Sequence, residues 1–417
     1  MSIAEGVQAQ VAYKAYSSGV ITANALATSS SDPGASSAQV LRRVASSLKL
    51  AKDTYQSAEI RADRQIADFR HGVKRVTGAV SGEFSPGTYM DFFEAACRGT
   101  RAAAVTASEA DFTSVAADNA TSKFTFASGN PVTKGFRVGN VLRFTGMSDT
   151  DNNSKNFVIL SFGGTQNRDV TVYPAPDTMS ADTAFNVAST GKSIIVPSSG
   201  FVSRKFGFEH YFSDLDIAHL FTECRIGGFN IQLPPTGMST VEFPVMGRNM
   251  ERYATSAAPF FTSPTAAGTT GVLAAVNGLL QVGGTTVGVV TGLSMQMDMS
   301  PSSDPVVGQN FVPEIFLGRA NITGQVTAMF QDDTLIGNFI NENEVSILAY
   351  LTTSTDVNSP AVTIFLPRVK FGDGTPPVQG EGAQIITLPF QALKSTSVEA
   401  TTGIPATTFQ MCDTEAA

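Results

Sequence analysis

The chain has 417 residues, of which 42% are hydrophobic and 15% are charged, with a formal net charge of −8. This length allows two or three globular domains, and the hydrophobic content excludes a disordered chain. The acidic balance argues against a tight nucleic-acid binder, and so few charges favour a subunit that buries much of its surface in an assembly.

The first part of the chain predicts an arm followed by strands. Residues 1–40, with SSSDPGASS at 29–37, are expected to form an N-terminal arm. In residues 58–63, AEIRAD, apolar Ile60 and Ala62 alternate with charged residues, which predicts a strand. Residues 73–84, VKRVTGAVSGEF, alternate more clearly and predict a strand with one buried face and one wet face.

A helix is expected directly after this strand. Ser85 is a candidate N-cap, Pro86 suits the first helical position, and Gly99 suits the end of the helix. The expected core residues of the strand and helix are Val76, Val80, Phe84, Tyr89, Phe92 and Phe93.

The strand and helix occur a second time. Residues 322–330, ITGQVTAMF, match residues 76–84, VTGAVSGEF, at four of nine positions, an offset of 246. Helical spacing follows again, and the expected core residues are Ile322, Val326, Phe330, Leu335 and Phe339. A second pair of segments, VEFPVM at 241–246 and ITLPFQ at 386–391, is related by an offset of 145 and predicts two further strands.

These markers divide the chain into two similar domains and an insertion. We expect a first domain from residues 41–100 and 201–250 and a second from 283–417, joined by a connection at 251–282. Between the two parts of the first domain, residues 101–200 contain short strand-like segments with Gly, Asp and Asn turns, which predict a small β-barrel.

Residue patterns for catalysis or metal binding are weak. Asp149, Asp151 and Asn153 resemble the opening of a calcium loop, but Ser154 and Leu160 stand where Gly and Glu are needed. The three cysteines are far apart, and no histidine has ligand spacing, so we expect no enzyme, metal or cofactor. No apolar run is long enough for a membrane span, and the first residues show no secretory signal.

Three stretches, residues 41–99, 204–248 and 382–393, resemble the tail tube or major tail proteins of long-tailed bacteriophages. The resemblance implies a mainly β fold, in which each tube domain is a β-sandwich or split barrel with a flanking helix. It also implies rings whose inner strands form one barrel around a channel for genomic DNA. Implied partners are other copies of the chain and the tape measure, tail terminator and distal tail proteins. The implied location is the virion tail, assembled in the host bacterial cytoplasm.

The usual ring of this family has six single-domain subunits, whereas this chain contains the tube unit twice. Three chains would supply six units, so we expect a trimeric ring with pseudo-sixfold symmetry. The polar faces of the predicted strands would line the channel: Glu59, Arg61, Asp63, Arg75, Thr77, Ser81 and Glu83 in the first copy, and Asn321, Thr323, Gln325 and Thr327 in the second. The two arginines fit a DNA conduit only if they pair with acids or if the faces are inverted.

Two other functions remain open at this stage. A tube protein of a contractile injection apparatus would have the same fold with a different cargo. A carbohydrate-binding β-rich surface protein would favour exposed aromatic platforms, and this chain has no Trp.

Overall fold

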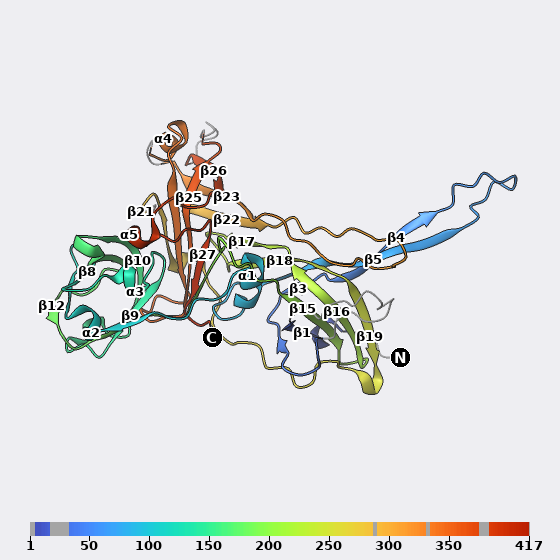
Figure 1. Ribbon diagram of the computed structural model, residues 1–417, viewed down its shortest axis with the longest axis horizontal. Coiled ribbons are helices and arrows are strands. Elements are labelled where there is room, and N and C mark those ends of the chain that lie inside the picture. Colours follow the sequence, from blue (N-terminus) through green and yellow to red (C-terminus); the bar gives the residue numbers. More distant parts are fainter. Residues whose placement is uncertain (1–4, 17–32, 287–289, 331–333, 375–382, 417) are drawn as a thin grey trace.

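The computed structural model describes residues 5–16, 33–286, 290–330, 334–374 and 383–416. It is mainly β, with the strands in two hydrogen-bonded systems of 19 and 8 strands. Figure 1 shows an elongated molecule with the eight-stranded part at one end and a long hairpin projecting at the other. The predicted β-sandwich class is confirmed.

The first half of the larger system has two layers. The strands that build them are β1 (Ala9–Tyr16), β2 (Gln39–Val40), β3 (Ala45–Ser46), β4 (Lys49–Gln56), β5 (Phe69–Glu83), β15 (Lys205–Phe212), β16 (Ile217–Ile226), β17 (Gly228–Leu233), β18 (Thr240–Gly247) and β19 (Asn249–Ala254). One layer holds β4, β5, β18 and β17, and the other holds β1, β15, β16 and β19. Helix α1 (Met90–Cys97) contributes aromatic rings to the core of this half.

The second half also has two layers, with β22, β23 and β26 opposite β20, β24, β25, β27 and β14. Its elements are β14 (Lys192–Ile195), β20 (Gly278–Val282), β21 (Thr285–Thr286), β22 (Val290–Asp298), β23 (Asn321–Met329), α4 (Thr334–Ile340), β24 (Val345–Thr352), β25 (Ala361–Phe371), β26 (Ile385–Ala392), α5 (Glu399–Thr402) and β27 (Gln410–Asp413). One hydrophobic core runs through both halves.

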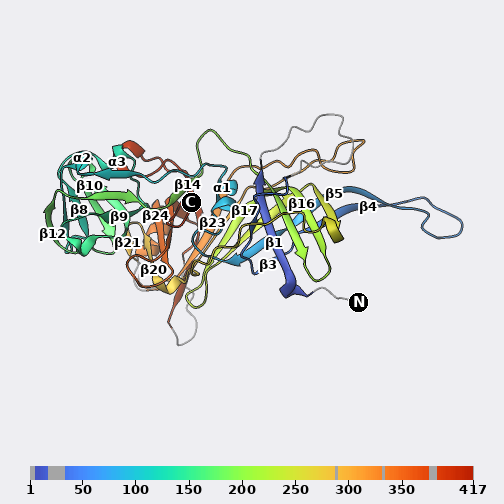
Figure 2. The same cartoon turned by 90° about the horizontal axis from the view of Figure 1, so that it is seen from below.

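The eight-stranded sheet lies beside the second half and has a core of its own, rich in phenylalanine. Figure 2 shows it at the end of the molecule opposite the long hairpin. It contains β6 (Thr106–Ser108), α2 (Glu109–Phe112), β7 (Val115–Asp118), β8 (Lys123–Phe126), α3 (Pro131–Lys134), β9 (Val141–Thr145), β10 (Asn156–Gly163), β11 (Asp169–Tyr173), β12 (Met179–Asp182) and β13 (Asn186–Ser189). Single 3-10 turns occupy Gly6–Gln8, Thr150–Asn152, Thr165–Asn167, Thr255–Ala257 and Ala275–Asn277.

Four local predictions are wrong. The sheet of the insertion ends at β12 and β6, which do not pair, so it does not close into a barrel. Residues 9–16 of the expected arm form β1, which pairs with β15 along its whole length. Residues 58–63 lie in the turn of the β4–β5 hairpin rather than in a strand. Helix α1 begins at Met90 because Ser85 is used in a buried turn, where its hydroxyl hydrogen-bonds Thr88.

Candidate channel-facing sheet

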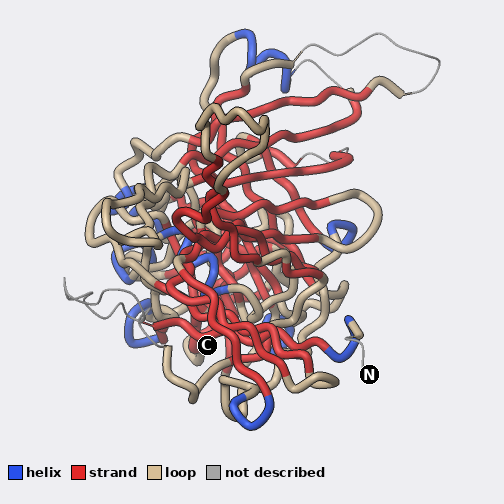
Figure 3. The backbone as a smooth tube through the Cα atoms, turned by 90° about the vertical axis from the view of Figure 1, so that its right-hand side faces the viewer, coloured by secondary structure: helices blue, strands red, loops and turns tan. Residues whose placement is uncertain are grey.

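The main candidate site is a surface, formed by one continuous sheet that crosses both halves. We call the strands β4–β5–β18–β17–β22–β23–β26, in this order, the joined sheet. Its central contact is the antiparallel pairing of β17 with β22, from Gly228 opposite Asp298 to Leu233 opposite Leu293. The two halves are thereby joined into one sheet. Figure 3 shows, from the end of the molecule, that strands lie side by side through the body of the protein.

The joined sheet has one buried face. On β5, Val76 and Val80 are fully buried, and on β23 Ile322 and Val326 are buried as well. Apolar residues at every second position of the other strands complete this face, because side chains alternate across a strand. These are Ile231, Val241, Phe243, Leu293, Met295, Met297, Leu388 and Phe390.

The opposite face is mainly polar. Arg75, Thr77, Ser81 and Glu83 of β5 are half-buried, and on β23 Asn321 and Gln325 are exposed while Thr323 and Thr327 are half-buried. Directly opposed residues of an antiparallel pair share a face, so the register extends these positions into rows. One row is Ser81, Glu242, Asn230, Gln296, Thr323 and Gln391; the next is Glu83, Thr240, Gln232, Ser294, Gln325 and Pro389.

The charges on this polar face are mostly negative or paired. Arg75 Nη2 lies 2.6 Å from Asp53 Oδ1 of β4, so its charge is balanced within the sheet. Glu83, Glu242 and Asp298 have no ion-pair partner among the described residues, and neither has Lys49 of β4, which lies opposite Thr77, so the unpaired acids outnumber this unpaired cation. A duplex phosphate backbone moving along such a surface is repelled rather than held.

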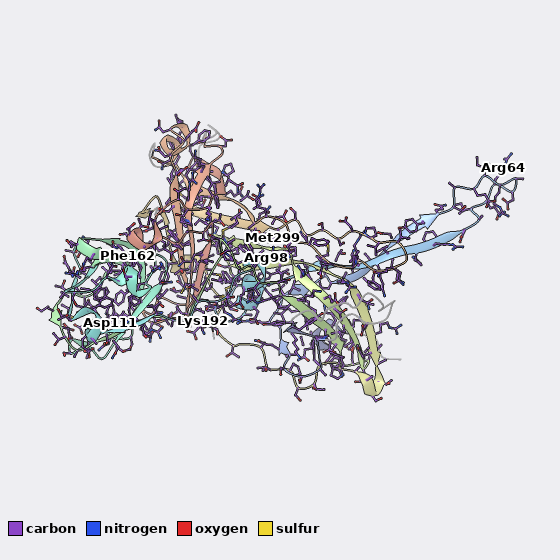
Figure 4. The ribbon with its side chains drawn as sticks, viewed as in Figure 1. Arg64, Arg98, Asp111, Phe162, Lys192 and Met299 are labelled. Carbon is purple, nitrogen blue, oxygen red and sulfur yellow. The ribbon has the colours of Figure 1, made fainter. Side chains whose placement is uncertain are left out.

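Three of the predicted channel residues lie elsewhere. Glu59, Arg61 and Asp63 are exposed in the turn of the β4–β5 hairpin, beyond the joined sheet, near the labelled Arg64 in Figure 4. There Arg61 lies 3.4 Å from Asp63 and 3.9 Å from Glu59. Alternation in six residues predicted a strand, but none of the described strands pairs with these residues.

The core residues differ between the two copies. The ring centroids of Phe84 and Phe93 of α1 lie 5.7 Å apart. Tyr89, Phe92 and Phe93 are fully buried. Burial also raises the pKa of the Tyr89 hydroxyl to about 12, and this hydroxyl donates to the Arg42 carbonyl at 2.6 Å.

In the second copy, the assignment of Phe330 to the core is wrong, since this side chain is 42% exposed. Helix α4 lies at the far end of its sheet rather than over it (Figure 1), whereas Phe84 packs against Phe93 of α1. Leu335 and Phe339 of α4 are partly buried against the common core.

Sequence reasoning missed the polar positions of β17, β18, β22 and β26. The sequence does contain a pattern that indicates these positions, because TVEFPVMG at 240–247 alternates between apolar residues and others. In the structure, Glu242 and Pro244 are exposed while Val241 and Phe243 are buried. The segment was interpreted only as a strand that reaches a proline. Its place beside β5 depends on pairing between residues about 160 positions apart.

Nothing in the described residues indicates a reaction centre. No group of three or more His, Cys, Asp or Glu there could hold a metal ion. Within the same ranges, no helix combines the length and apolar character needed to cross a membrane.

Comparison with known families agrees with this geometry. The family model described as phage tail tube protein matches residues 6–392. This chain belongs to the phage tail tube protein family. A search of the curated proteins found no match. Members of this family are structural subunits of the virion tail and assemble with themselves and with other tail proteins, which is consistent with a protein that is not an enzyme.

Proposed function

We propose that the chain is a duplicated tail tube subunit that forms stacked trimeric rings around a DNA channel. The observation that carries this proposal is the β17–β22 pairing, through which two similar sheets become one. Each half contributes a long hairpin, β4–β5 or β22–β23, and a strand with a central proline, β18 or β26. The β17–β22 contact then corresponds to the contact between neighbouring subunits in a six-membered ring.

The two ends of the joined sheet support closure by further copies. Among the described residues, β4 pairs only with β5, so its outer edge, Lys49–Gln56, has unused backbone groups. β4 corresponds to β22, and it would meet the second half of the next chain as β22 meets β17. An exposed edge is a template for pairing with another chain, and a head-to-tail contact of this kind closes after three copies if each half turns the ring by one sixth.

The polar face of the joined sheet would then line the channel. The proposed lining residues are Arg75, Thr77, Ser81, Glu83, Asn321, Thr323, Gln325 and Thr327, together with Asn230, Glu242, Gln296 and Gln391. The Arg75–Asp53 pair and the unpaired carboxylates leave this surface without a net attraction for DNA. Double-stranded DNA would therefore pass along this surface without being bound by it.

We further propose the domain division of residues 41–100 with 201–250, 101–200, and 283–417, with 251–282 as the connection. The insertion packs on β24 and β25, on the side away from the polar face, so it would decorate the outside of the ring. Assembly in the host cytoplasm and contacts with the tape measure, terminator and distal tail proteins belong to the same proposal.

Negative-stain electron microscopy of the purified chain tests this function, with mass photometry of the same sample. We expect rings or hollow tubes with three outer lobes, and a smallest ring with three times the 43.8 kDa chain mass. Monomers at high concentration, with no ring or tube, would overturn the proposal. Rings with six whole chains would overturn the duplicated, trimeric form of it.

A further inference from the structure

The chain has two arms that correspond to each other, position by position along the part that returns to the sheet. We call residues 53–72 the first arm and residues 299–318 the second arm; each is the outer part of a hairpin, β4–β5 or β22–β23. In the first, Tyr55 pairs with Arg70, and in the second Ser302 pairs with Phe316. With Val76 aligned to Ile322, the same offset of 246 relates Arg70 to Phe316 and Gly72 to Gly318.

The second arm is folded onto the first half of its own chain. Glu314 binds two cations of that half, with its carboxylate oxygens 3.2 Å from Lys205 Nζ and 3.0 Å from Arg225 Nη2. Beside it, Val312 and Ile315 are fully buried. The backbone also contributes, because the Val312 carbonyl accepts from Arg248 Nε at 2.7 Å.

The first arm presents the same chemistry, but its apolar side chains are exposed. The residues that correspond to Glu314, Val312 and Ile315 are Asp68, Ile66 and Phe69. Ile66 is 66% exposed and Phe69 is 57% exposed, whereas their counterparts are buried. Asp68 is exposed, and its carboxylate pairs with the neighbouring Arg70 at 2.7 Å. Large apolar side chains exposed on a projecting hairpin indicate a partner surface.

The second half carries a counterpart of the surface that receives the second arm. In the first half this surface is formed by Lys205, Glu223 and Arg225, where Lys205 Nζ lies 3.3 Å from Glu223. β15 and β16 share an irregular register at this point, and β24 and β25 have the same irregularity. Aligning the two registers relates Lys205 to Glu344, Glu223 to Arg368 and Arg225 to Lys370.

The second surface keeps the ion pair with its charges reversed. Arg368 Nη2 lies 2.5 Å from Glu344 Oε1, and the hydrogen bond from Arg368 lowers the pKa of the Glu344 carboxyl. Lys370 keeps the positive charge of Arg225 and has no ion-pair partner within the described ranges. Glu344 is exposed, unlike its counterpart Lys205.

We propose that the first arm docks onto the Glu344–Arg368–Lys370 surface of a neighbouring copy of this chain, with Asp68 bound to Lys370. Ile66 and Phe69 are buried in this contact, as Val312 and Ile315 are within one chain. The contact cannot form within one chain, because the first arm and β25 project from different parts of the molecule (Figures 1 and 4). The inference rests on the proposed self-assembly and specifies where one subunit holds the next.

The reversed ion pair explains how each arm finds its own surface. Glu314 needs two cations, Lys205 and Arg225, and on the second half Glu344 replaces one of them. Asp68, with the neighbouring Arg70, suits a surface of mixed charge on which Lys370 has no ion-pair partner among the described residues. Like charges brought together disfavour the wrong partner, so the arms are not interchangeable.

Disulfide trapping tests the contact directly. The native Cys97, Cys224 and Cys412 are buried, and burial raises the pKa of each thiol, so they react poorly. We expect a chain with both Asp68→Cys and Lys370→Cys to form covalent dimers and trimers under mild oxidation. A mixture of chains with Asp68→Cys alone and chains with Lys370→Cys alone should give covalent dimers only. The control is a chain with Asp68→Cys and Lys123→Cys. Lys123 lies in the insertion, away from the proposed contact, so this chain should form no covalent dimers or trimers.

Charge exchange gives a second readout. Lys370→Asp is expected to weaken assembly by about tenfold, the effect of roughly 1.4 kcal/mol. Adding Asp68→Lys should restore it, whereas Lys123→Asp should leave assembly unchanged. Rings that form without a disulfide between the two introduced thiols would overturn this inference and leave the proposed function intact. A wild-type chain that forms no assembly overturns the proposed function and this inference with it.

Discussion

Among single residues, Phe84 shows how strongly the environment decides the role of a side chain. Phe84 is buried under α1, and Phe330, at the matching place of the second copy, is 42% exposed. We predict that Phe84→Ala lowers the free energy of unfolding by about 3–5 kcal/mol, because it leaves a cavity in a packed aromatic core. Phe330→Ala is the matched control and should change it by less than about 1 kcal/mol. Urea unfolding of unassembled chains measures both, and equal losses would contradict the assignment.

Asp413 gives a residue-scale prediction for pH. Its carboxylate is buried at the end of β27 and accepts from the backbone N–H groups of Gly87 and Glu415 at 2.7 and 2.9 Å. Burial raises the pKa of Asp413 from 3.8 to about 6, an effect larger than that of these hydrogen bonds. The folded chain therefore holds this proton more tightly than the unfolded chain. The resulting stability is fully present below about pH 4 and is lost as the pH rises through 6.

Asp413→Asn should remove this dependence. Relative to the variant, we expect the natural chain to lose about 2–3 kcal/mol of unfolding free energy between pH 4 and 7, since one pKa unit corresponds to about 1.4 kcal/mol. Urea unfolding at pH 4, 5, 6 and 7 measures the difference. Asp304→Asn, at an exposed site, is the control and should leave the profile unchanged. If both variants have the same profile as the natural chain, Asp413 is not the titrating group.

Between elements, the β17–β22 pairing is the contact on which the continuous sheet depends. Gly228 begins β17 with a φ of +151°, and a Cβ there would lie 1.9 Å from the Met297 carbonyl oxygen. We predict that Gly228→Ala forces the two strands apart and lowers the unfolding free energy by about 3 kcal/mol or more. Thermal unfolding with limited proteolysis detects the loss.

The matched control for this contact is Gly163→Ala at the end of β10. Open space surrounds the position of its Cβ, and its backbone is not left-handed. We expect a change of no more than about 0.5 kcal/mol. If Gly228→Ala leaves the unfolding free energy unchanged, the halves are held together mainly by their common core, and the strand pairing adds little.

At the scale of the whole molecule, the insertion begins and ends at neighbouring points, so a short turn could replace it. Its two ends lie together, because Ser189 N–H donates to the Val105 carbonyl at 2.8 Å and β6 pairs with β13. It contacts the second half through an apolar cluster that includes Val141, Leu348 and Phe365. Its contacts therefore fall on the layer opposite the joined sheet.

We predict that replacing residues 106–188 with a short Gly-Ser turn leaves ring formation intact and removes the outer lobes from electron micrographs. Leu348 and Phe365 should be changed to Thr in the same variant, because large exposed apolar patches promote aggregation. A variant with the two Thr changes alone is the control for their effect. Loss of rings only when the insertion is absent would show that it takes part in assembly.

The sequence by itself determined the local features: the period-two strands, their buried and polar faces, the two copies at an offset of 246, and the family resemblance. Alternation depends only on backbone geometry, so Val76, Val80, Ile322 and Val326 could be placed on a buried face without knowing their partners. The tertiary structure decided everything that depends on distant neighbours. It placed β17 beside β22, left residues 58–63 in a projecting turn, and covered Phe84 but not Phe330. Pairing and burial are set by contacts between residues far apart in the chain, which no local pattern records.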